Sequence, residues 1–188
     1  MEAYDDPKNR ARILGRDRRA QWLKVDAIIE KVGVSQGMVC VDLGCGAGTL
    51  SLPLADKVGN TGKVYAVDTN HDVLQVIKEK HPPDNLVVLQ AGAADTGLDA
   101  SIADCCFMIL LLHEVPSEGV VAEAYRLLKA EGKAIILEWR IDFDSPRPPL
   151  NERIDRQRME QLLTEAGFSL IEYTEWSDSH YVITAVKC

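Results

Sequence analysis

Short apolar runs alternate along the chain with longer segments in which apolar residues recur every three or four positions. Apolar runs of about four to eight residues between turn residues predict buried strands, and the recurring pattern predicts amphipathic helices. Their alternation predicts a doubly wound parallel sheet of the α/β class with helices on both faces. One predicted strand begins at Val39, and the others are 63–68, 85–90, 104–111, 134–138, 168–175 and 180–187. The predicted helices cover about 8–32, 50–58, 73–77, 117–128 and 153–166.

The last two predicted strands are joined only by the short segment 176–179. A crossover between parallel strands needs about a dozen residues or more, so these two strands are predicted to form an antiparallel hairpin. The segment 104–111 is apolar almost throughout. That composition is expected of a central parallel strand, which is buried on both faces.

Length and composition are those of one compact domain: 188 residues, of which 46% are hydrophobic and 27% charged. The net charge of −8 argues against a dedicated nucleic-acid binder, because phosphate contacts need a positive surface. Basic residues still gather near the N-terminus, as a solvated helix face or as a basic lip that attracts an anionic substrate. They are Lys8, Arg10, Arg12, Arg16, Arg18, Arg19 and Lys24.

No apolar run approaches the ~18–20 residues that cross a bilayer, and no signal-peptide pattern is expected from the charged N-terminus. The five cysteines are an odd number without the spacing of metal ligands, so no metal site is predicted. Cys40, Cys105 and Cys106 fall within predicted strands, where thiols pack as small apolar groups. A reducing cytoplasm is the expected location.

Three glycines follow the first predicted strand, in the segment 42–48, Asp-Leu-Gly-Cys-Gly-Ala-Gly. Glycine permits unusual backbone angles and close approach of a ligand, while the following helix start offers free N–H groups. Asp68 ends the next predicted strand, at about the distance where an acidic residue binds ribose hydroxyls in nucleotide-binding folds. The two signals predict a cofactor that contains adenosine. The third glycine comes one position earlier than in the dinucleotide fingerprint, which disfavours NAD.

The segment 41–50, Val-Asp-Leu-Gly-Cys-Gly-Ala-Gly-Thr-Leu, resembles motif I of the class I S-adenosylmethionine-dependent methyltransferases. The segment 64–70, Val-Tyr-Ala-Val-Asp-Thr-Asn, resembles their motif II. The resemblance implies that Asp42 lies near the methionine amino group, that the glycines lie under the sulfonium and ribose, and that Asp68 binds the ribose diol. The cofactor-binding residues implied in this way are Asp42, Gly44, Cys45, Gly46, Gly48, Asp68, Thr69, Gly92, Ala93 and Leu111.

The resemblance covers 37–188 and implies a seven-stranded sheet in the order 3-2-1-4-5-7-6, with strand 7 antiparallel. We therefore expect one methyltransferase domain, with about 1–36 as an N-terminal helical lid or extension on a core of 37–188. One departure from the family concerns the adenine, because relatives carry an acidic residue where this chain has Gly92. Either the backbone of Gly92 and Ala93 holds the adenine, or Asp95 reaches back to it.

His113 is the candidate catalytic residue, because the preceding strand ends near the transferred methyl group in methyltransferases of this fold. An imidazole titrates near neutral pH and can remove a proton from a phenol, enol or carbon acid. The alternative is a structural histidine that ties its loop to the sheet, and Glu114 is expected to be a helix-entry or surface carboxylate. Trp139 lines a substrate pocket or packs on the last helix. Further pocket candidates are Tyr4, Arg140, Phe143, Arg147, His180 and Tyr181.

The sequence thus favours S-adenosylmethionine-dependent methyl transfer to a small molecule, in a chain that resembles the quinone-biosynthesis methyltransferases. A non-catalytic module that binds S-adenosylmethionine is the first alternative, and a nucleotide-dependent dehydrogenase is the second. The expected partner is a small-molecule substrate rather than nucleic acid. A monomer and a homodimer are both compatible with the sequence.

Overall fold

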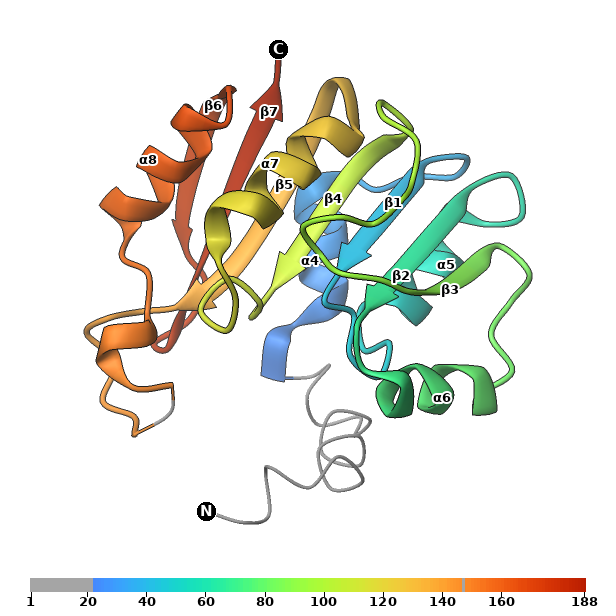
Figure 1. Cartoon of the computed structure of the whole chain (residues 1–188), viewed down its shortest axis with the longest axis horizontal. Helices are drawn as coiled ribbons and strands as arrows, with labels where there is room; N and C mark the ends of the chain where they lie inside the picture. Colours follow the sequence, from blue (N-terminus) through green and yellow to red (C-terminus); the bar gives the residue numbers. More distant parts are fainter. Residues whose placement is uncertain (1–21, 147) are drawn as a thin grey trace. The chain divides into compact units, whose positions relative to one another are not determined.

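The structure is a computed structural model that describes residues 22–146 and 148–188. The chain divides into two compact units, Met1–Ala93 and Ala94–Cys188. The strands follow the order β3-β2-β1-β4-β5-β7-β6 in a seven-stranded sheet (Figure 1). The predicted α/β class, strand number and strand order are thereby confirmed. The prediction of a single domain with an N-terminal extension stays a prediction.

The first unit contains three parallel strands, and β2 has the predicted bounds. Helices α5 and α6 pack on these strands, and α4 packs on α5. Its elements are α4 (Val25–Val32), β1 (Val39–Leu43), α5 (Ser51–Val58), β2 (Lys63–Asp68), α6 (His71–Glu79) and β3 (Leu86–Gln90). The predicted helix over 8–32 is confirmed only for α4, because Lys24, with a φ of 53°, interrupts the helix, and residues 8–21 with most of the basic cluster lie outside the described residues.

Local chemistry explains where the helices of this unit begin and end. The side chain of Asn70 accepts a hydrogen bond from the Asp72 N–H and so caps the start of α6. The buried face of α6 consists of Val73, Leu74 and Ile77, as the periodicity predicts. At the end of α4, Gly33 takes the left-handed conformation typical of a helix C-terminus.

The second unit pairs β4 with β5 in parallel, and it pairs β7 with both β5 and β6 in antiparallel fashion. The predicted closing hairpin is therefore confirmed, with both strand bounds as expected (Figure 1). Helices α7 and α8 pack on the strands of this unit and on each other. Its elements are β4 (Ala103–Ile109), α7 (Ser117–Leu127), β5 (Leu128–Trp139), the 3-10 helix η1 (Leu150–Glu152), α8 (Arg156–Glu165), β6 (Phe168–Glu175) and β7 (His180–Lys187).

Strand β4 ends at Ile109 rather than at 111, because Leu110 has a φ of 55°, and the predicted starts of β5 and α8 are wrong as well. Strand β5 begins at Leu128 rather than at 134, because Leu128 pairs with Ala103 before the register shifts. The polar residues at this shift, which include Glu131 with a φ of 63°, conceal the start of the strand. Helix α8 begins at Arg156 rather than at Arg153, because Asp155 caps it by accepting the Arg158 N–H at 2.7 Å.

The cysteines lie as the strand assignment predicts. Cys40, Cys105 and Cys106 are buried in strands, and all five cysteines are free thiols. Within residues 22–146 and 148–188, no helix is both long enough and apolar enough to span a membrane. The same residues contain no group of three or more His, Cys, Asp or Glu side chains arranged to hold a metal ion.

Candidate functional site

The glycine-rich turn after β1 folds in the left-handed region of backbone space. Gly44, Gly46 and Gly48 have φ values of 71°, 53° and 77°. Other residues pay about 1–2 kcal/mol for this conformation, so the turn depends on glycine. The N–H groups of Gly44 and Cys45 both donate to the carbonyl of Val67, at 2.8 and 2.9 Å. The turn is therefore fixed against the end of β2.

Asp68 closes this turn from the end of β2. Its Oδ2 accepts the N–H of Gly46 and its Oδ1 accepts the N–H of Asn70, each at 2.9 Å. A carboxylate offers about four acceptor positions, so both oxygens retain capacity for a further donor such as a ribose hydroxyl. The structure thus brings together two of the predicted cofactor-binding features, the turn and the acid.

Asp42 and Cys45 lie deeper in the same unit. Asp42 is buried, and its Oδ2 accepts the hydroxyl of Ser51 at 2.5 Å, at the start of α5. Burial raises the pKa of the Cys45 thiol, and the charges of Asp42 and Asp68 raise it further. The thiol therefore stays protonated and is no nucleophile. Both carboxylates are close enough to this thiol to act on it electrostatically.

The segments that follow β2 and β3 are joined by hydrogen bonds within the unit. The exposed Thr69 accepts the side-chain amide of Gln90 on its carbonyl at 3.1 Å. The N–H of Ala91 donates to the Asp68 carbonyl at 3.1 Å, next to the half-buried Gly92 and Ala93. These bonds tie the segment after β2 to the end of β3, next to Gly92 and Ala93.

In the second unit, His113 is held by a buried carboxylate. Nδ1 of His113 lies 2.8 Å from Oε2 of Glu138, the penultimate residue of β5. The Glu138 side chain is 0% exposed and that of His113 is 7% exposed. On the other side of the ring, Nε2 lies 3.8 Å from a carboxylate oxygen of the exposed Glu114. A carboxylate and an imidazole so arranged resemble the acid–histidine pairs of general-base catalysts.

The electrostatic environment favours the protonated imidazole. Burial alone lowers the pKa of His113. The hydrogen bond to Glu138, with the charges of Glu138, Glu114 and Glu152, outweighs burial and raises that pKa above 6.5. The surrounding carboxylates thus favour a proton on His113.

The turn that carries His113 begins with a strained residue. Leu110 has a φ of 55° immediately after β4, a conformation that is uncommon outside glycine. Leu111 is half-buried, and its carbonyl accepts the N–H of Glu114 at 2.9 Å. Leu111 thus lies in the same tight turn as His113.

The segment between β5 and α8 is organised around Arg153. This side chain is buried, and its guanidinium donates to the carbonyls of Arg140, Phe143, Ser145 and Pro148 at 2.6 to 3.0 Å. The arginine therefore supplies hydrogen-bond donors to backbone carbonyls of the segment that precedes η1. The loop and its contacts belong entirely to the second unit.

The predicted pocket residues around this loop lie in different environments. Trp139 stacks on Phe143 and lies 4.3 Å from the ring of His180. Arg140 is held in ion pairs by Asp142 and Glu175. Tyr181 is buried, and its hydroxyl donates to the Ile154 carbonyl. His180 is likewise buried, while Tyr4 and Arg147 lie outside the described residues.

Sequence reasoning missed the roles of Glu138 and Arg153. Glu138 ends the apolar run Ile135-Ile136-Leu137, and a carboxylate there must be buried and therefore paired. The position of Glu138 therefore indicates that its carboxylate has a buried partner, but it does not identify that partner. For Arg153 no such signal existed, because its partners are backbone carbonyls.

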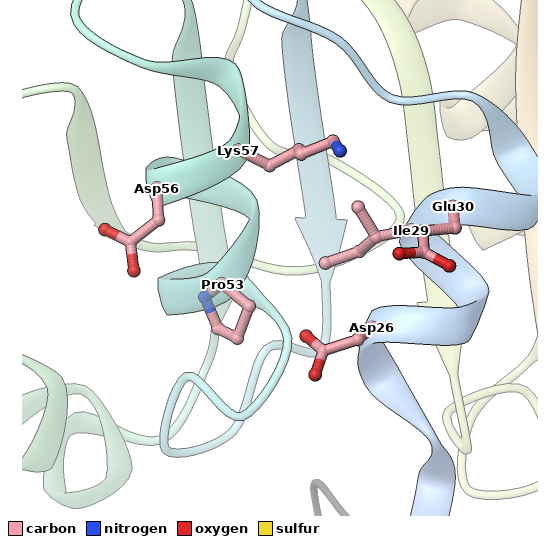
Figure 2. A pocket seen from close by; sticks show the side chains of 6 residues that line it. All are labelled: Asp26, Ile29, Glu30, Pro53, Asp56 and Lys57. Carbon is pink, nitrogen blue, oxygen red and sulfur yellow. The ribbon is translucent and has the colours of Figure 1, made fainter.

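A cavity of about 370 Å³ lies between α4 and α5, and Figure 2 shows the side chains around it. None of the predicted cofactor-binding residues lines it. The lining consists of acidic, apolar and basic side chains, namely Asp26, Ile29, Glu30, Pro53, Asp56 and Lys57.

Comparisons with known proteins bear on the class of this chain. A family profile described as "Methyltransferase domain" matches residues 41–136. A 2-phytyl-1,4-naphtoquinone methyltransferase of Trichormus variabilis is 30% identical over 135 residues, which are 65% of this chain and 59% of that protein. The ubiquinone/menaquinone biosynthesis C-methyltransferase UbiE of Francisella tularensis is 27% identical over 184 residues, covering 77% of this chain and 72% of that protein.

The crystal structure of a SAM dependent methyltransferase from Aquifex aeolicus has the same fold, with a TM-score of 0.88 and 24% identity. The match covers 97% of this chain and 99% of that one. The family profile spans half of the sequence, and so this chain belongs to the methyltransferase-domain family. It covers less than two thirds of the length of the first curated relative.

Proposed function

We propose that this chain is an S-adenosylmethionine-dependent methyltransferase that acts on a small molecule. The observation that carries the proposal is the Asp68 carboxylate bound to the Gly46 N–H, which joins the acid at the end of β2 to the glycine turn. Family membership supports the same activity. The two curated relatives are named as a naphthoquinone methyltransferase and as a methyltransferase of ubiquinone and menaquinone biosynthesis, which favours a quinol or related phenol as the acceptor.

The residues of the first unit fit the cofactor. The left-handed turn leaves its backbone free of side chains where adenosine and the sulfonium would bind, and Asp68 retains acceptor capacity for the ribose hydroxyls. Bound S-adenosylmethionine supplies an activated methyl group on sulfur. The residues of this unit proposed to hold it are Asp42, Gly44, Cys45, Gly46, Gly48, Asp68, Thr69, Gly92 and Ala93. For the adenine, the backbone of Gly92 and Ala93 is the proposed contact, and Asp95 is the alternative.

His113 is the proposed general base. Its Nε2 would accept the proton that a phenol, enol or carbon acid loses as it gains a methyl group. Because Nδ1 of His113 is engaged by Glu138, Nε2 is the ring nitrogen that can accept this proton. The conjugate imidazolium then forms beside three carboxylates, which stabilise its positive charge.

The net charge and the cysteines support further proposals on the acceptor and the cellular compartment. The net charge of −8 favours a small-molecule acceptor over nucleic acid. Five free cysteines favour a reducing compartment such as the cytoplasm. We propose one functional domain, with the first 36 or so residues as an extension and with a homodimer as the alternative to a monomer.

A thermal-shift panel with S-adenosylmethionine, S-adenosylhomocysteine and NAD tests the cofactor. A ligand at a hundredfold excess over its dissociation constant stabilises a protein by about 2.7 kcal/mol. We expect both adenosyl ligands to raise the Tm and NAD to leave it unchanged. Stabilisation by NAD alone would instead identify a dehydrogenase. A screen of quinols, phenols, thiols and amines for release of S-adenosylhomocysteine then separates an enzyme from a non-catalytic binding module.

A further inference from the structure

Glu138 is surrounded by N–H donors at the end of β5. Oε1 accepts the N–H of Leu112 at 2.8 Å and the N–H of His113 at 3.3 Å. Oε2 lies 2.8 Å from Nδ1 of His113 and accepts the N–H of Trp139 at 3.3 Å. One fully buried carboxylate therefore binds both the backbone and the side chain of His113.

A buried carboxylate in this setting acts only as an acceptor. Burial of a charge is costly unless it is matched by hydrogen bonds, and backbone N–H groups donate to both Glu138 oxygens, from Leu112 and His113 to Oε1 and from Trp139 to Oε2. The nitrogen that faces Oε2 must therefore carry a hydrogen. In neutral His113 this places the proton on Nδ1 and leaves the lone pair on Nε2.

We propose that Glu138 is the positioning residue of His113: it selects the tautomer with hydrogen on Nδ1 and fixes the ring so that Nε2 is the acceptor nitrogen. The proposal rests on His113 being the base of the proposed methyl transfer, and it deepens that function by adding a residue that acts through another. Glu138 itself touches neither acceptor nor cofactor in this role. It works by holding one ring nitrogen while the other exchanges the proton.

The carboxylates around the ring have different tasks in this arrangement. Glu138 contributes from β5, Glu114 from the turn of His113 itself and Glu152 from η1. Of these three carboxylates, Glu138 alone forms a short contact with a ring nitrogen, at 2.8 Å from Nδ1, whereas Glu114 lies 3.8 Å from Nε2. Glu114 and Glu152 therefore add a general attraction for the proton, whereas Glu138 alone decides which nitrogen keeps it.

The experiment is a nitrogen-15 NMR titration of the histidine side chains in the full chain, without cofactor or acceptor. In the wild-type protein we expect neutral His113 to carry its hydrogen on Nδ1 and to titrate above 6.5. Glu138→Gln should lower the pKa of His113 by one unit or more and populate both tautomers. Glu123→Gln, the same change at a buried carboxylate of α7, should leave His113 unchanged.

Each result decides the proposal. A wild-type spectrum with the hydrogen on Nε2 overturns it, and this measurement needs no variant that must fold. An unchanged pKa and tautomer in Glu138→Gln overturns it as well. Once an acceptor is known, the same variant should reduce kcat at least tenfold while the KM for S-adenosylmethionine stays constant.

Failure of the proposed function looks different. If no acceptor is methylated, or if His113→Ala retains full activity, the assignment of the base is wrong, but the NMR result still reports whether Glu138 sets the tautomer. The two ideas therefore fail on separate measurements.

Discussion

The carboxylate of Asp68 accepts the backbone N–H of Gly46, which lies 22 residues earlier in the chain, at 2.9 Å. This bond joins the acidic end of β2 to the middle of the glycine turn. Asp68 therefore has two tasks in the proposed enzyme, because the same side chain shapes the turn and would bind the ribose. A substitution at this position tests both.

Asp68→Ala should weaken binding of S-adenosylmethionine by at least tenfold. Charge-assisted hydrogen bonds are worth roughly 1.5–3 kcal/mol each, and the turn also loses its Gly46 contact. Asp68→Asn keeps one carbonyl oxygen as an acceptor, so its loss of affinity should be smaller. Isothermal titration calorimetry measures both. An unchanged dissociation constant in Asp68→Ala would mean that the ribose binds elsewhere.

Gly48→Ala should destabilise the fold more than Gly33→Ala. Both glycines have left-handed backbones, with φ values of 77° and 79°. A Cβ at Gly48 would lie 3.0 Å from Cγ1 of Ile77, whereas a Cβ at Gly33 would have nothing within 4 Å. The strain of about 1–2 kcal/mol is common to both variants, and the contact with α6 adds to it only at Gly48. Equal decreases in Tm for Gly48→Ala and Gly33→Ala would show that α6 shifts to accommodate the added methyl group without a cost in stability.

Replacement of Arg153 should loosen the segment between β5 and α8. Arg153→Met removes all four donors to loop carbonyls, and Arg153→Lys keeps the charge but cannot reproduce the planar fork. We expect a loss of at least ~2 kcal/mol in urea unfolding for Arg153→Met, since four buried or part-buried carbonyls lose a charged partner.

The matched control is Arg156→Lys, at an exposed arginine paired with Glu160. Its unfolding free energy should change by less than about 1 kcal/mol. Limited proteolysis should show faster cleavage within 140–149 only in the Arg153 variants. Cleavage at the wild-type rate in Arg153→Met would mean that other contacts hold the loop.

Glu123 should contribute stability that is lost in acid. Burial raises its pKa, but hydrogen bonds from Arg126 and Thr96 and the charge of Arg126 outweigh burial and hold the pKa at about 2, below its ordinary 4.5. A depressed pKa means that the contribution is fully present above pH 4.5 and disappears as pH falls toward 2. At roughly 1.4 kcal/mol per pKa unit this amounts to about 3 kcal/mol.

Urea unfolding of the wild-type protein and of Glu123→Gln between pH 2 and 7 measures this contribution, and the two curves should converge at the acid end. A constant difference across that range would show that the lost stability comes from packing rather than from the charge.

The sequence predicts most of the fold because the pattern that buries a strand is local. The bounds of β2, β6 and β7 follow from apolar runs between turn residues. Prediction from the sequence fails where the pairing partner of a residue is distant in the chain. The start of β5 depends on the pairing of Leu128 with Ala103, and nothing near Leu128 reports it.

The candidate site divides in the same way. The glycine turn and Asp68 are visible in the sequence because their chemistry requires particular residues at particular spacings. The partner of His113 is not, because Glu138 lies 25 residues away and meets it only through the parallel pairing of β4 and β5. The sequence places the buried Arg153 within a predicted helix, because contacts with loop carbonyls leave no periodic pattern that would mark it as a loop residue.

His113→Ala should separate a catalytic histidine from a structural one. If His113 is the base, kcat should fall by about 10²–10⁴, the usual range for a positioned proton acceptor, while affinity for S-adenosylmethionine stays nearly constant. Only the neutral imidazole can accept a proton. Burial lowers the pKa of His113, but the hydrogen bond to Glu138 and the charges of Glu138, Glu114 and Glu152 outweigh burial and raise this pKa above 6.5. The wild-type rate should therefore rise with pH through a midpoint above 6.5, and His113→Ala should lose that limb. His81→Ala, at an exposed histidine, serves as the control and should keep both the rate and its pH profile.

A structural role of His113 would instead lower the Tm and the cofactor affinity of His113→Ala together. Full activity in His113→Ala would remove the residue from the mechanism.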